Sequence, residues 1–399
     1  MNSAPPGFPA PWSFPVHITL TTPALLSLLC RAGAAALTAA VLGCSTAPHS
    51  PPSKPELRLE VVAELPQQLT GVAVSRTGRL FVNVPSWVDK PSPSLAEVTD
   101  RGEVKPFPNA EWNQWDGQPG ESAANHFVCV QAVWVDGKDR LWVVDSASPN
   151  FSGVVPGGAK LVEVDLATNT VARVYPFDST VAPPASYLND VRVEPSRRYA
   201  FLTDSGLGAL LVVDLESGRI RRLLETHPSV KAEPLELTVQ KYPWRNAQGQ
   251  TPAIHSDGIA MAPDGRYLYY HALTGHTLYR VPVMALINEG LSPEALAAQV
   301  ERLATTAAAD GMEMDSKGRL YLTDLENDAV VSWTPEEGVR PVVSDPQLAW
   351  PDSLAVDPQG RVYVTASQIH RMPGFNDGKD RRQRPFQVFP WKHEYCYNA

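Results

Sequence analysis

Apolar and polar residues alternate along most of the chain in short runs, which are separated by Gly, Asp, Asn and Pro. Residues 256–281 show the pattern clearly. Their sequence, SDGIAMAPDGRYLYYHALTGHTLYRV, contains an apolar run, a Pro-Asp-Gly turn, a second apolar run, another turn and a third run. Runs of this kind with turn residues between them are typical of antiparallel strands joined as hairpins. The pattern therefore predicts a mainly β protein.

The same unit occurs six times in register. The copies begin at Thr70, Gln131, Asn189, Asp257, Asp310 and Asp352. Nine positions later each copy carries an arginine: Arg79, Arg140, Arg198, Arg266, Arg319 and Arg361. A second hairpin usually follows, as in ALLVVDLESGRIRRLLE at residues 209–225, so each copy supplies four strands. Six such copies predict an all-β fold, a six-bladed β-propeller, over residues 59–392.

Two insertions interrupt the repeat. The sequence predicts a helix over Ser292–Leu303, with Ser292 as its N-cap and Pro293 in its first turn. Residues 106–127 form a long polar and aromatic loop, PFPNAEWNQWDGQPGESAANHF. Because long loops on a propeller usually shape access to its channel, we expect this loop to lie over one mouth.

The N-terminal region contains an apolar run, AGAAALTAAVLG at residues 32–43, that follows Arg31 and ends at Cys44. This pattern predicts a secretory signal over residues 1–43. The sequence VLGC also fits a bacterial lipobox, in which Cys44 is lipidated and becomes the N-terminus of the mature chain. A plain signal peptide and a membrane anchor are the alternatives, although a spanning helix needs roughly 20 apolar residues. We therefore expect an exported protein of the cell envelope, with residues 44–58 as a flexible tether and contact with the membrane only through the lipid.

Composition limits the partners. The chain has 399 residues, is 43% hydrophobic and carries a formal net charge of −9. No basic patch stands out in the sequence, so we expect a small-molecule ligand and no nucleic-acid partner. The oligomeric state is not indicated.

Cysteine usage suggests one disulfide. Cys30 and Cys44 belong to the leader, and Cys129 and Cys396 remain, the second in a tail of residues 393–399. In an oxidising compartment Cys129 and Cys396 are expected to pair. The alternative is a buried free thiol at Cys129 and an unpaired thiol in the tail.

The first residue of each copy is expected at the head of the innermost strand, where it faces the tunnel mouth. All six are polar and form the predicted ligand site: Thr70, Gln131, Asn189, Asp257, Asp310 and Asp352. Converging carboxylates repel each other unless a cation or a proton neutralises them. Oxygen ligands suit Ca²⁺, Mg²⁺ or Mn²⁺, so a divalent cation is expected on Asn189, Asp257, Asp310 and Asp352. The alternative is that these residues only cap the turns before the strands.

Three histidines near the same mouth are candidate general bases: His255, His271 and His370. The sequence contains no Gly-rich phosphate loop, HExxH, CxxC or Gly-x-Ser-x-Gly motif. Serine hydrolase and nucleotide chemistry therefore have no support.

Several blocks of the chain resemble successive blocks of the yellow and major royal jelly protein family. They include QAVWVDGKDRLWVVDSA (131–147), KLVEVDLATNTVARVYPF (160–177) and YAFLTDSGLGALLVVDLESG (199–218), and the similarity extends over roughly residues 57–391. The resemblance implies a secreted six-bladed propeller. Some insect members are dopachrome-converting enzymes, and others bind small amines in the propeller mouth. The family shares no single catalytic set, so the resemblance assigns no catalytic residue.

A looser resemblance connects the chain with gluconolactonase and senescence-marker propellers. Asn189, Asp257 and Asp310 match positions at which those proteins hold a divalent metal. Thr70 stands where they carry a glutamate, and Asp352 is the candidate substitute.

The resemblances favour an exported propeller that binds a small polar molecule at its mouth and converts it in a dopachrome-tautomerase-like reaction. A metal-dependent, lactonase-like hydrolase is one alternative. A protein that binds an amine or catechol without turnover is the other.

Overall fold

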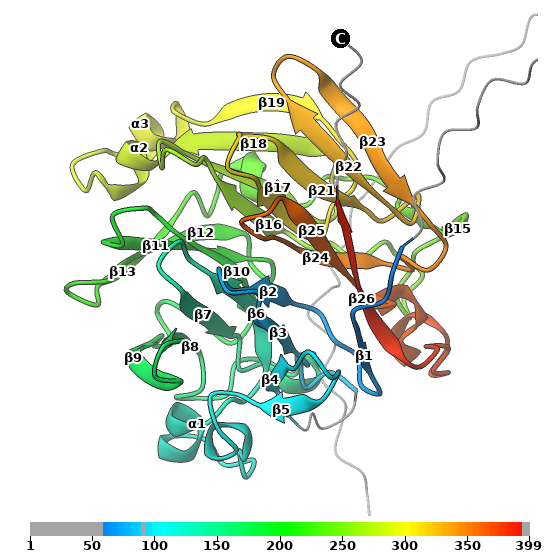
Figure 1. Cartoon of the computed structure of the whole chain (residues 1–399). Helices are drawn as coiled ribbons and strands as arrows, with labels where there is room; N and C mark the ends of the chain where they lie inside the picture. The colour runs from blue at the N-terminus through cyan, green and yellow to red at the C-terminus, as the bar shows by residue number, and fades with distance from the viewer. Residues whose placement is uncertain (1–58, 89–92, 393–399) are drawn as a thin grey trace, which may run out of the picture. The chain divides into compact units, whose positions relative to one another are not determined.

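Six four-stranded antiparallel sheets are arranged as the blades of a β-propeller (Figure 1). The computed structural model describes residues 59–88 and 93–392. The prediction of an all-β, six-bladed propeller is therefore confirmed. The expected signal, the lipidation site at Cys44, the tether and the C-terminal tail lie outside the described residues.

The first five blades each consist of four strands that follow one another in the sequence. Blade 1 contains β2 (Val72–Val74), β3 (Leu80–Asn83), β4 (Leu95–Val98) and β5 (Val104–Pro106). Blade 2 contains β6 (Val130–Val135), β7 (Arg140–Asp145), β8 (Lys160–Asp165) and β9 (Thr170–Pro176). Blade 3 contains β10 (Leu188–Val193), β11 (Tyr199–Asp204), β12 (Ala209–Asp214) and β13 (Ile220–Leu223). Blade 4 contains β16 (Ser256–Met261), β17 (Tyr267–Ala272), β18 (Thr277–Pro282) and β19 (Glu301–Thr305). Blade 5 contains β20 (Met312–Met314), β21 (Leu320–Asp324), β22 (Ala329–Thr334) and β23 (Gly338–Ser344).

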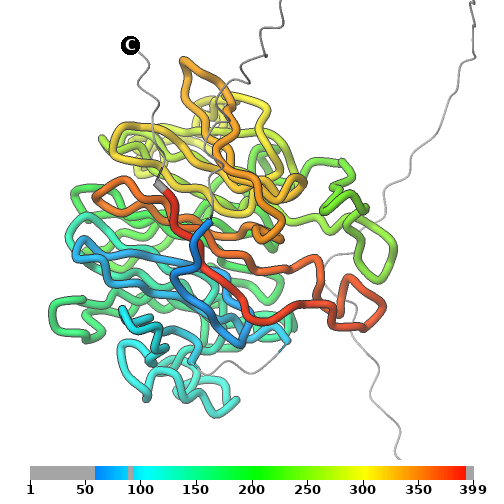
Figure 2. Tube along the Cα trace, turned by 45° about the vertical axis from the view of Figure 1, so that its right-hand side comes forward, coloured from blue at the N-terminus to red at the C-terminus, as the bar shows by residue number. Residues whose placement is uncertain are grey.

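The sixth blade joins the two ends of the described chain. It contains β24 (Pro351–Val356), β25 (Arg361–Ala366), β26 (Phe386–Lys392) and, as its outermost strand, β1 (Ala63–Leu65). The strand β1 pairs antiparallel with β26, with Ala63 opposite Val388. Figure 2 shows this contact as a blue segment beside a red one. The ring is thus closed by backbone hydrogen bonds between the first and last strands.

The first strands of adjacent blades contact one another, so they form the wall of the central tunnel. The middle strands are buried on both faces because neighbouring blades cover both sides. In β7, four successive residues are fully buried: Leu141, Trp142, Val143 and Val144. All four residues of the outer strand β13 are partly exposed. This burial explains the near-continuous apolar runs in the second strand of each copy.

The predicted helix over Ser292–Leu303 is shorter than expected. The helix α3 spans Pro293–Ala297, and the Ser292 hydroxyl accepts a hydrogen bond from the Ala295 N–H at 3.2 Å, which confirms the N-cap. The helix ends early because the chain from Glu301 pairs with β18 as the outer strand β19. The other short elements are η1 (Glu111–Asn113), α1 (Glu121–Asn125), η2 (Pro149–Phe151), η3 (Pro228–Val230), β14 (Thr238–Val239), β15 (Tyr242–Pro243), α2 (Val283–Ile287), η4 (Ile369–Arg371) and η5 (Pro373–Phe375).

The loop at residues 106–127 does not lie over the tunnel mouth, so that prediction was wrong. Its Asn113 side-chain oxygen accepts a hydrogen bond from the Leu95 N–H of β4 at 2.9 Å, and its Ala123 carbonyl accepts one from Lys160 of β8 at 2.9 Å. Trp112 packs partly buried against the apolar cluster between blades 1 and 2. Burial of its aromatic side chains therefore holds this loop beside the blades.

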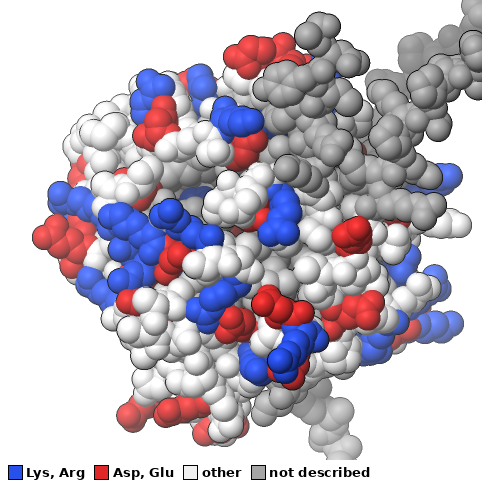
Figure 3. Space-filling model, viewed as in Figure 1, with Lys and Arg blue, Asp and Glu red and all other residues white. Residues whose placement is uncertain are grey.

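Charges of both signs are interspersed on the face seen in Figure 3. Many belong to ion pairs at strand ends, such as Arg79 with Glu97 and Arg319 with Glu337. Within residues 59–88 and 93–392, no helix is long and apolar enough to cross a bilayer.

Candidate functional site at the propeller mouth

Five of the six predicted ligand residues line one cavity of about 980 Å³ at one end of the tunnel: Gln131, Asn189, Asp257, Asp310 and Asp352. Thr70 does not line it. The Thr70 hydroxyl donates a hydrogen bond to the Gln131 carbonyl at 3.2 Å and accepts one from the Asn83 amide at 2.8 Å, so it holds blade 1 against blade 2. The prediction that the strand heads face the tunnel mouth therefore agrees with the structure at five of the six positions.

β-Bulges place the strand heads outside the regular ladders. Register shifts occur in four inner strands and enclose Gln131, Asn189, Asp257 and Asp352. A bulge leaves a residue unpaired and redirects its side chain. This irregularity at the start of four inner strands explains how their polar side chains reach the tunnel although the rest of each strand is mostly apolar.

Glycines after two of the acids let adjacent inner strands approach closely. A Cβ at Gly258 would lie 2.6 Å from the Asp310 carbonyl oxygen, and one at Gly311 would lie 2.3 Å from the Asp352 carbonyl oxygen. The Gly311 N–H donates to that Asp352 oxygen at 2.8 Å. The glycines that follow Asp257 and Asp310 therefore allow adjacent blades to approach closely. This contact brings Asp257, Asp310 and Asp352 to the same end of the tunnel.

The three carboxyl groups are buried side by side. Burial, together with the nearby carboxyl of Asp352, raises the pKa values of Asp257 and Asp310 well above their usual range. Asp257 and Asp310 also disfavour each other's ionised form, because two negative charges repel within one buried cavity. The Trp350 indole N–H donates to Asp310 at 2.7 Å. The site thus combines proton donors and acceptors within one buried cluster.

Asp352 differs from its two neighbours. One of its carboxylate oxygens accepts a hydrogen bond from the Ser353 hydroxyl at 3.1 Å, whereas the other is buried without a hydrogen-bond partner among the described residues. Burial raises the pKa of Asp352 to about 7. Asp352 is therefore the acid of this cluster that gains or loses its proton near neutral pH.

Aromatic side chains form much of the cavity wall: Trp87, Phe151, Tyr187, Trp350 and Phe375. Trp87 stacks on Phe151 with ring centroids 5.1 Å apart and donates its indole N–H to the Tyr187 hydroxyl at 2.5 Å. That hydroxyl donates to the Gln131 side chain at 2.9 Å. No Lys, Arg or His occurs among the described residues that line the cavity. The cavity is thus acidic at its base and aromatic at its sides.

An ion network closes the tunnel beneath the acids. The fully desolvated Arg192 pairs with Asp190 at 2.9 Å and with Glu313 at 3.2 Å, and Trp134 donates to Glu313 at 3.1 Å. None of these side chains lines the mouth cavity or the cavity at the opposite rim. The mouth cavity therefore has a closed base.

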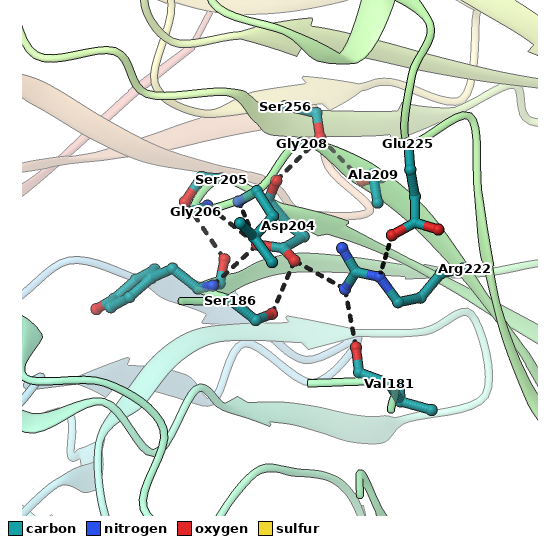
Figure 4. Close-up of polar contacts among 12 residues, drawn as sticks. Val181, Ser186, Asp204, Ser205, Gly206, Gly208, Ala209, Arg222, Glu225 and Ser256 are labelled. Atoms are coloured by element: carbon teal, nitrogen blue, oxygen red, sulfur yellow. Dashed lines mark hydrogen bonds and ion pairs between the residues drawn. The ribbon is translucent and has the colours of Figure 1, made fainter. Parts of the chain in front are cut away.

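The wall that carries Tyr187 is fixed by Asp204 (Figure 4). The Asp204 carboxylate accepts hydrogen bonds from the Tyr187 N–H at 2.8 Å, the Ser186 hydroxyl at 2.7 Å and the Arg222 guanidinium at 2.8 Å. Arg222 also donates to the Val181 carbonyl at 2.8 Å. Asp204 thereby ties the loop before β10 to the end of β11 and holds the Tyr187 ring at the mouth.

The candidate histidines do not line the mouth cavity. The His255 ring accepts a hydrogen bond from the Ala232 N–H at 2.9 Å, and burial lowers its pKa to about 4. His271 is fully buried against Ala272 and Thr306, and burial lowers its pKa to about 4. His370 stacks on Trp350 with ring centroids 5.9 Å apart, and burial lowers its pKa to about 3. The titratable groups that line the mouth cavity are instead the three carboxyl groups and the Tyr187 hydroxyl.

The oxygen donors at the mouth match the hard cations expected from the sequence, but three of the four predicted ligands already accept hydrogen bonds from neighbouring side chains. The Asn189 side-chain oxygen accepts from Gln131 at 3.2 Å, and Asp310 accepts from Trp350. In the part of the chain that the structure describes, no three His, Cys, Asp or Glu side chains form a cluster able to hold a metal. A cation on Asn189, Asp257, Asp310 and Asp352 stays a prediction.

Cys129 is a free, fully buried thiol, and burial raises its pKa to about 12. It packs with Trp87, Tyr187 and Met372 behind the cavity wall. Cys396 lies outside the described residues. The Cys129–Cys396 disulfide stays a prediction.

Fold and site together define a six-bladed β-propeller with a blind acidic and aromatic cavity at one mouth. Residues 128–389 match the family model of the major royal jelly proteins. This match covers more than half of the chain, and the protein belongs to the major royal jelly protein family.

Two relatives share limited identity with the chain. Dopaminechrome tautomerase of Drosophila melanogaster is 24% identical over 228 residues, which are 53% of this chain and 47% of the relative. Major royal jelly protein 6 of Apis mellifera is 21% identical over 246 residues, which are 59% of this chain and 53% of the relative. The chain therefore spans about half the length of these relatives.

Solved structures share the fold. A gluconolactonase from Xanthomonas campestris superposes with a TM-score of 0.51 at 12% identity, covering 84% of this chain and 89% of the other. The calcium-binding protein regucalcin from Agrobacterium tumefaciens gives a TM-score of 0.51 at 15% identity, covering 84% and 93%. At these identities the likeness shows the fold alone.

Proposed function

We propose that the mouth cavity binds a small aromatic amine, with the cationic nitrogen at the acidic base and the ring between the aromatic walls. The observation that carries this proposal is the combination of Asp257, Asp310 and Asp352 in one cavity that has no lining Lys, Arg or His among the described residues. A buried cluster of acids is stabilised by a cation, and aromatic faces attract both cations and flat rings. The volume of about 980 Å³ accommodates a ligand of this size.

The chain further converts its ligand by moving a proton between two of the ligand's atoms. A tautomerase performs this chemistry, and the Drosophila relative carries that name. The ionised member of the Asp257–Asp310 pair accepts a proton from a ligand carbon, and the protonated member donates one to a ligand oxygen. Protons and charge balance over the step, so it requires no metal and no redox partner.

The test compares wild type with Asp310→Asn. We expect dopamine to bind to the wild-type protein in calorimetry and dopaminechrome to lose its visible absorbance with turnover. The Asp310→Asn variant should bind dopamine at least about tenfold more weakly, equivalent to about 1.4 kcal/mol, and lose turnover. The affinity of the wild type should rise between pH 5 and 8, because ionisation of Asp352, whose pKa is raised to about 7 by burial, adds negative charge to the cavity.

Asp100→Asn is the matched control, since Asp100 is exposed on the surface and should affect neither measurement. Absence of dopamine binding at millimolar concentration would refute the proposal. Binding without turnover would retain the amine site and exclude the tautomerase step, leaving a non-catalytic binding protein.

A metal-dependent lactonase is the second candidate. It is favoured by the unpartnered Asp352 oxygen and by Asn189, Asp257 and Asp310 on three successive blades. Among the described residues no three His, Cys, Asp or Glu side chains are placed to hold a metal ion, which gives this candidate less support. Calcium and manganese titrations in the same calorimeter, with hydrolysis of a sugar lactone as the activity, distinguish it from the amine site.

The protein acts outside the cytoplasm, held to the membrane by a lipid on Cys44. This proposal rests on the apolar run before Cys44 and on the family resemblance. Cell fractionation should find the wild type in the membrane fraction and the Cys44→Ser variant outside it. Unchanged membrane association of the variant would contradict the lipid anchor.

A further inference from the structure

A second cavity lies beside the mouth cavity, between the β14–β15 hairpin and the segment that contains η4 and η5. Its volume is about 350 Å³, and Phe375 lines both cavities. The two differ in charge. Arg245, Arg371 and Arg381 line the second cavity, and none of its described lining residues is Asp or Glu, although Arg245 pairs with Glu236 outside the cavity lining. The second cavity therefore favours an anion, whereas the mouth favours a cation.

Arg371 is the inner cation of this cavity and forms no ion pair with a described carboxylate. Its guanidinium donates only to neutral amide oxygens, those of Gln368 and Gln240, each at 3.1 Å. Burial lowers the pKa of Arg371, opposed by the more distant carboxylate of Asp328. A half-buried cation without an anionic partner is costly, so an anion from outside the chain would stabilise it.

A buried donor in the wall has no acceptor either. Trp244 is 3% exposed, and its indole N–H makes no hydrogen bond to a described residue. His370, also in the wall, is joined to the Gln240 oxygen through Nε2 at 3.1 Å, so that nitrogen carries the proton. Its Nδ1 is buried without a partner and can accept a hydrogen bond. The cavity thus offers a ligand the Trp244 N–H as a neutral donor and the His370 Nδ1 as a neutral acceptor, beside the charged arginines.

The remaining wall is aromatic. Tyr242 is 76% exposed, the highest fraction among the large apolar side chains of the described residues. Trp244 packs on Phe375 with ring centroids 5.1 Å apart. An exposed ring at the rim and two packed rings inside provide flat surfaces for a planar ligand.

We propose that this second cavity is a binding site for a small aromatic carboxylate, with the carboxylate at Arg371 and Arg381 and the ring between Tyr242 and Phe375. A guanidinium matches a carboxylate with two parallel hydrogen bonds. The site is separate from the amine site, and the inference does not rest on the proposed function.

The experiment uses calorimetry on the full chain with three probes: indole-3-acetate, its neutral amide indole-3-acetamide, and inorganic phosphate. Indole-3-acetate should bind at least about tenfold more tightly than the amide, because only the carboxylate pairs with the arginines, and than phosphate, because only the ring uses the aromatic wall. Arg371→Gln and Arg381→Gln should each weaken indole-3-acetate about tenfold. Arg381→Gln is included because the Arg381 side chain forms no hydrogen bond or ion pair with a described residue, so its replacement should leave the structure intact.

Arg198→Gln is the matched control, since Arg198 is 57% exposed and distant from this cavity in the fold. Glu97→Gln, in blade 1, should leave the affinity for indole-3-acetate within about twofold, because Glu97 pairs with Arg79 and does not line this cavity. Equal affinity for the acid and its amide, or for the acid and phosphate, would overturn the assignment. Wild-type affinity in both Arg371→Gln and Arg381→Gln would overturn it as well.

Discussion

Replacing Asp204 with Ala should lower the free energy of unfolding by about 3–5 kcal/mol. The Asp204 side chain is fully buried, and its partner Arg222 is only 7% exposed. Without the carboxylate, the Arg222 charge would stay buried with the more exposed Glu225 as its remaining ion-pair partner. The Tyr187 and Gly206 N–H groups would also lose their acceptor. The expected loss is therefore larger than that of a single hydrogen bond.

Asp214→Ala is the matched control, because Asp214 ends the neighbouring strand of the same blade at the opposite rim. Its carboxylate accepts only from backbone N–H groups of its own turn, at residues 216 and 217, so its loss should cost about 1 kcal/mol. Urea unfolding monitored by tryptophan fluorescence measures both. Adding Arg222→Met to Asp204→Ala should recover part of the stability, since the unpaired charge is then removed. Equal losses in the two single variants would contradict the role of Asp204.

Asp204 also illustrates a signal that the sequence contains and that the repeat analysis did not use. The second strand ends with Asp in three copies: Asp145, Asp204 and Asp324. Asp145 is paired with Lys160 at 2.9 Å, with both side chains almost completely buried, and accepts the Cys129 N–H at 2.8 Å. The same position thus ties the mouth loop to its blade in blades 2 and 3. A repeated acid after an apolar strand is a sign of such a buried contact.

The fold could be predicted because each copy repeats the same order of apolar runs and turns. The alternation of runs and turns predicts strands, and the number of copies predicts the number of blades. The closing strand β1 could not, because Ala63–Leu65 has no repeat head and its partner β26 lies at the other end of the described chain. The length of α3 was missed for a related reason. Pairing of Glu301 with Arg280 in the β18–β19 ladder overrides the local helical pattern.

The acids of the site could be predicted because each stands at a fixed place in the repeat. The walls could not, because Phe151, Tyr187 and Phe375 come from loops without periodicity. Trp350 lies two residues before Asp352, so its place next to a strand head was the available signal. The histidines could not be placed from the sequence, because proximity to a strand head along the chain does not determine which cavity a side chain lines. His370 shows this, since it stacks on Trp350 of the mouth cavity but itself lines the second cavity.

Replacing Asp352 with Asn should stabilise the protein at neutral and alkaline pH. The carboxyl of Asp352 has its pKa raised to about 7 by burial, whereas an unfolded Asp titrates near 3.9. Between these two values the folded state binds more protons than the unfolded state, so stability falls as pH rises from about 4 to about 7 and is then constant. A shift of one pKa unit corresponds to about 1.4 kcal/mol. Because the asparagine amide must also be accommodated in the buried site, we expect a net gain on the order of 2 kcal/mol at pH 8.

The measurement is the urea midpoint of wild type and Asp352→Asn at several pH values between 4 and 8. The two proteins should be closest near pH 4, where the folded carboxyl is protonated and the unfolded carboxyl is only about half ionised, and should diverge as pH rises. Burial also raises the pKa values of Asp257 and Asp310, but both acids are present in the two proteins, so the difference between wild type and Asp352→Asn reports on Asp352. Asp100→Asn on the surface should follow wild type throughout. A constant difference between Asp352→Asn and wild type across pH would refute the buried ionisation. If the stabilities of the two proteins diverge as predicted, the mouth contains an acid whose ionised form destabilises the fold. Such a cost is expected of a group that is retained to bind a cation.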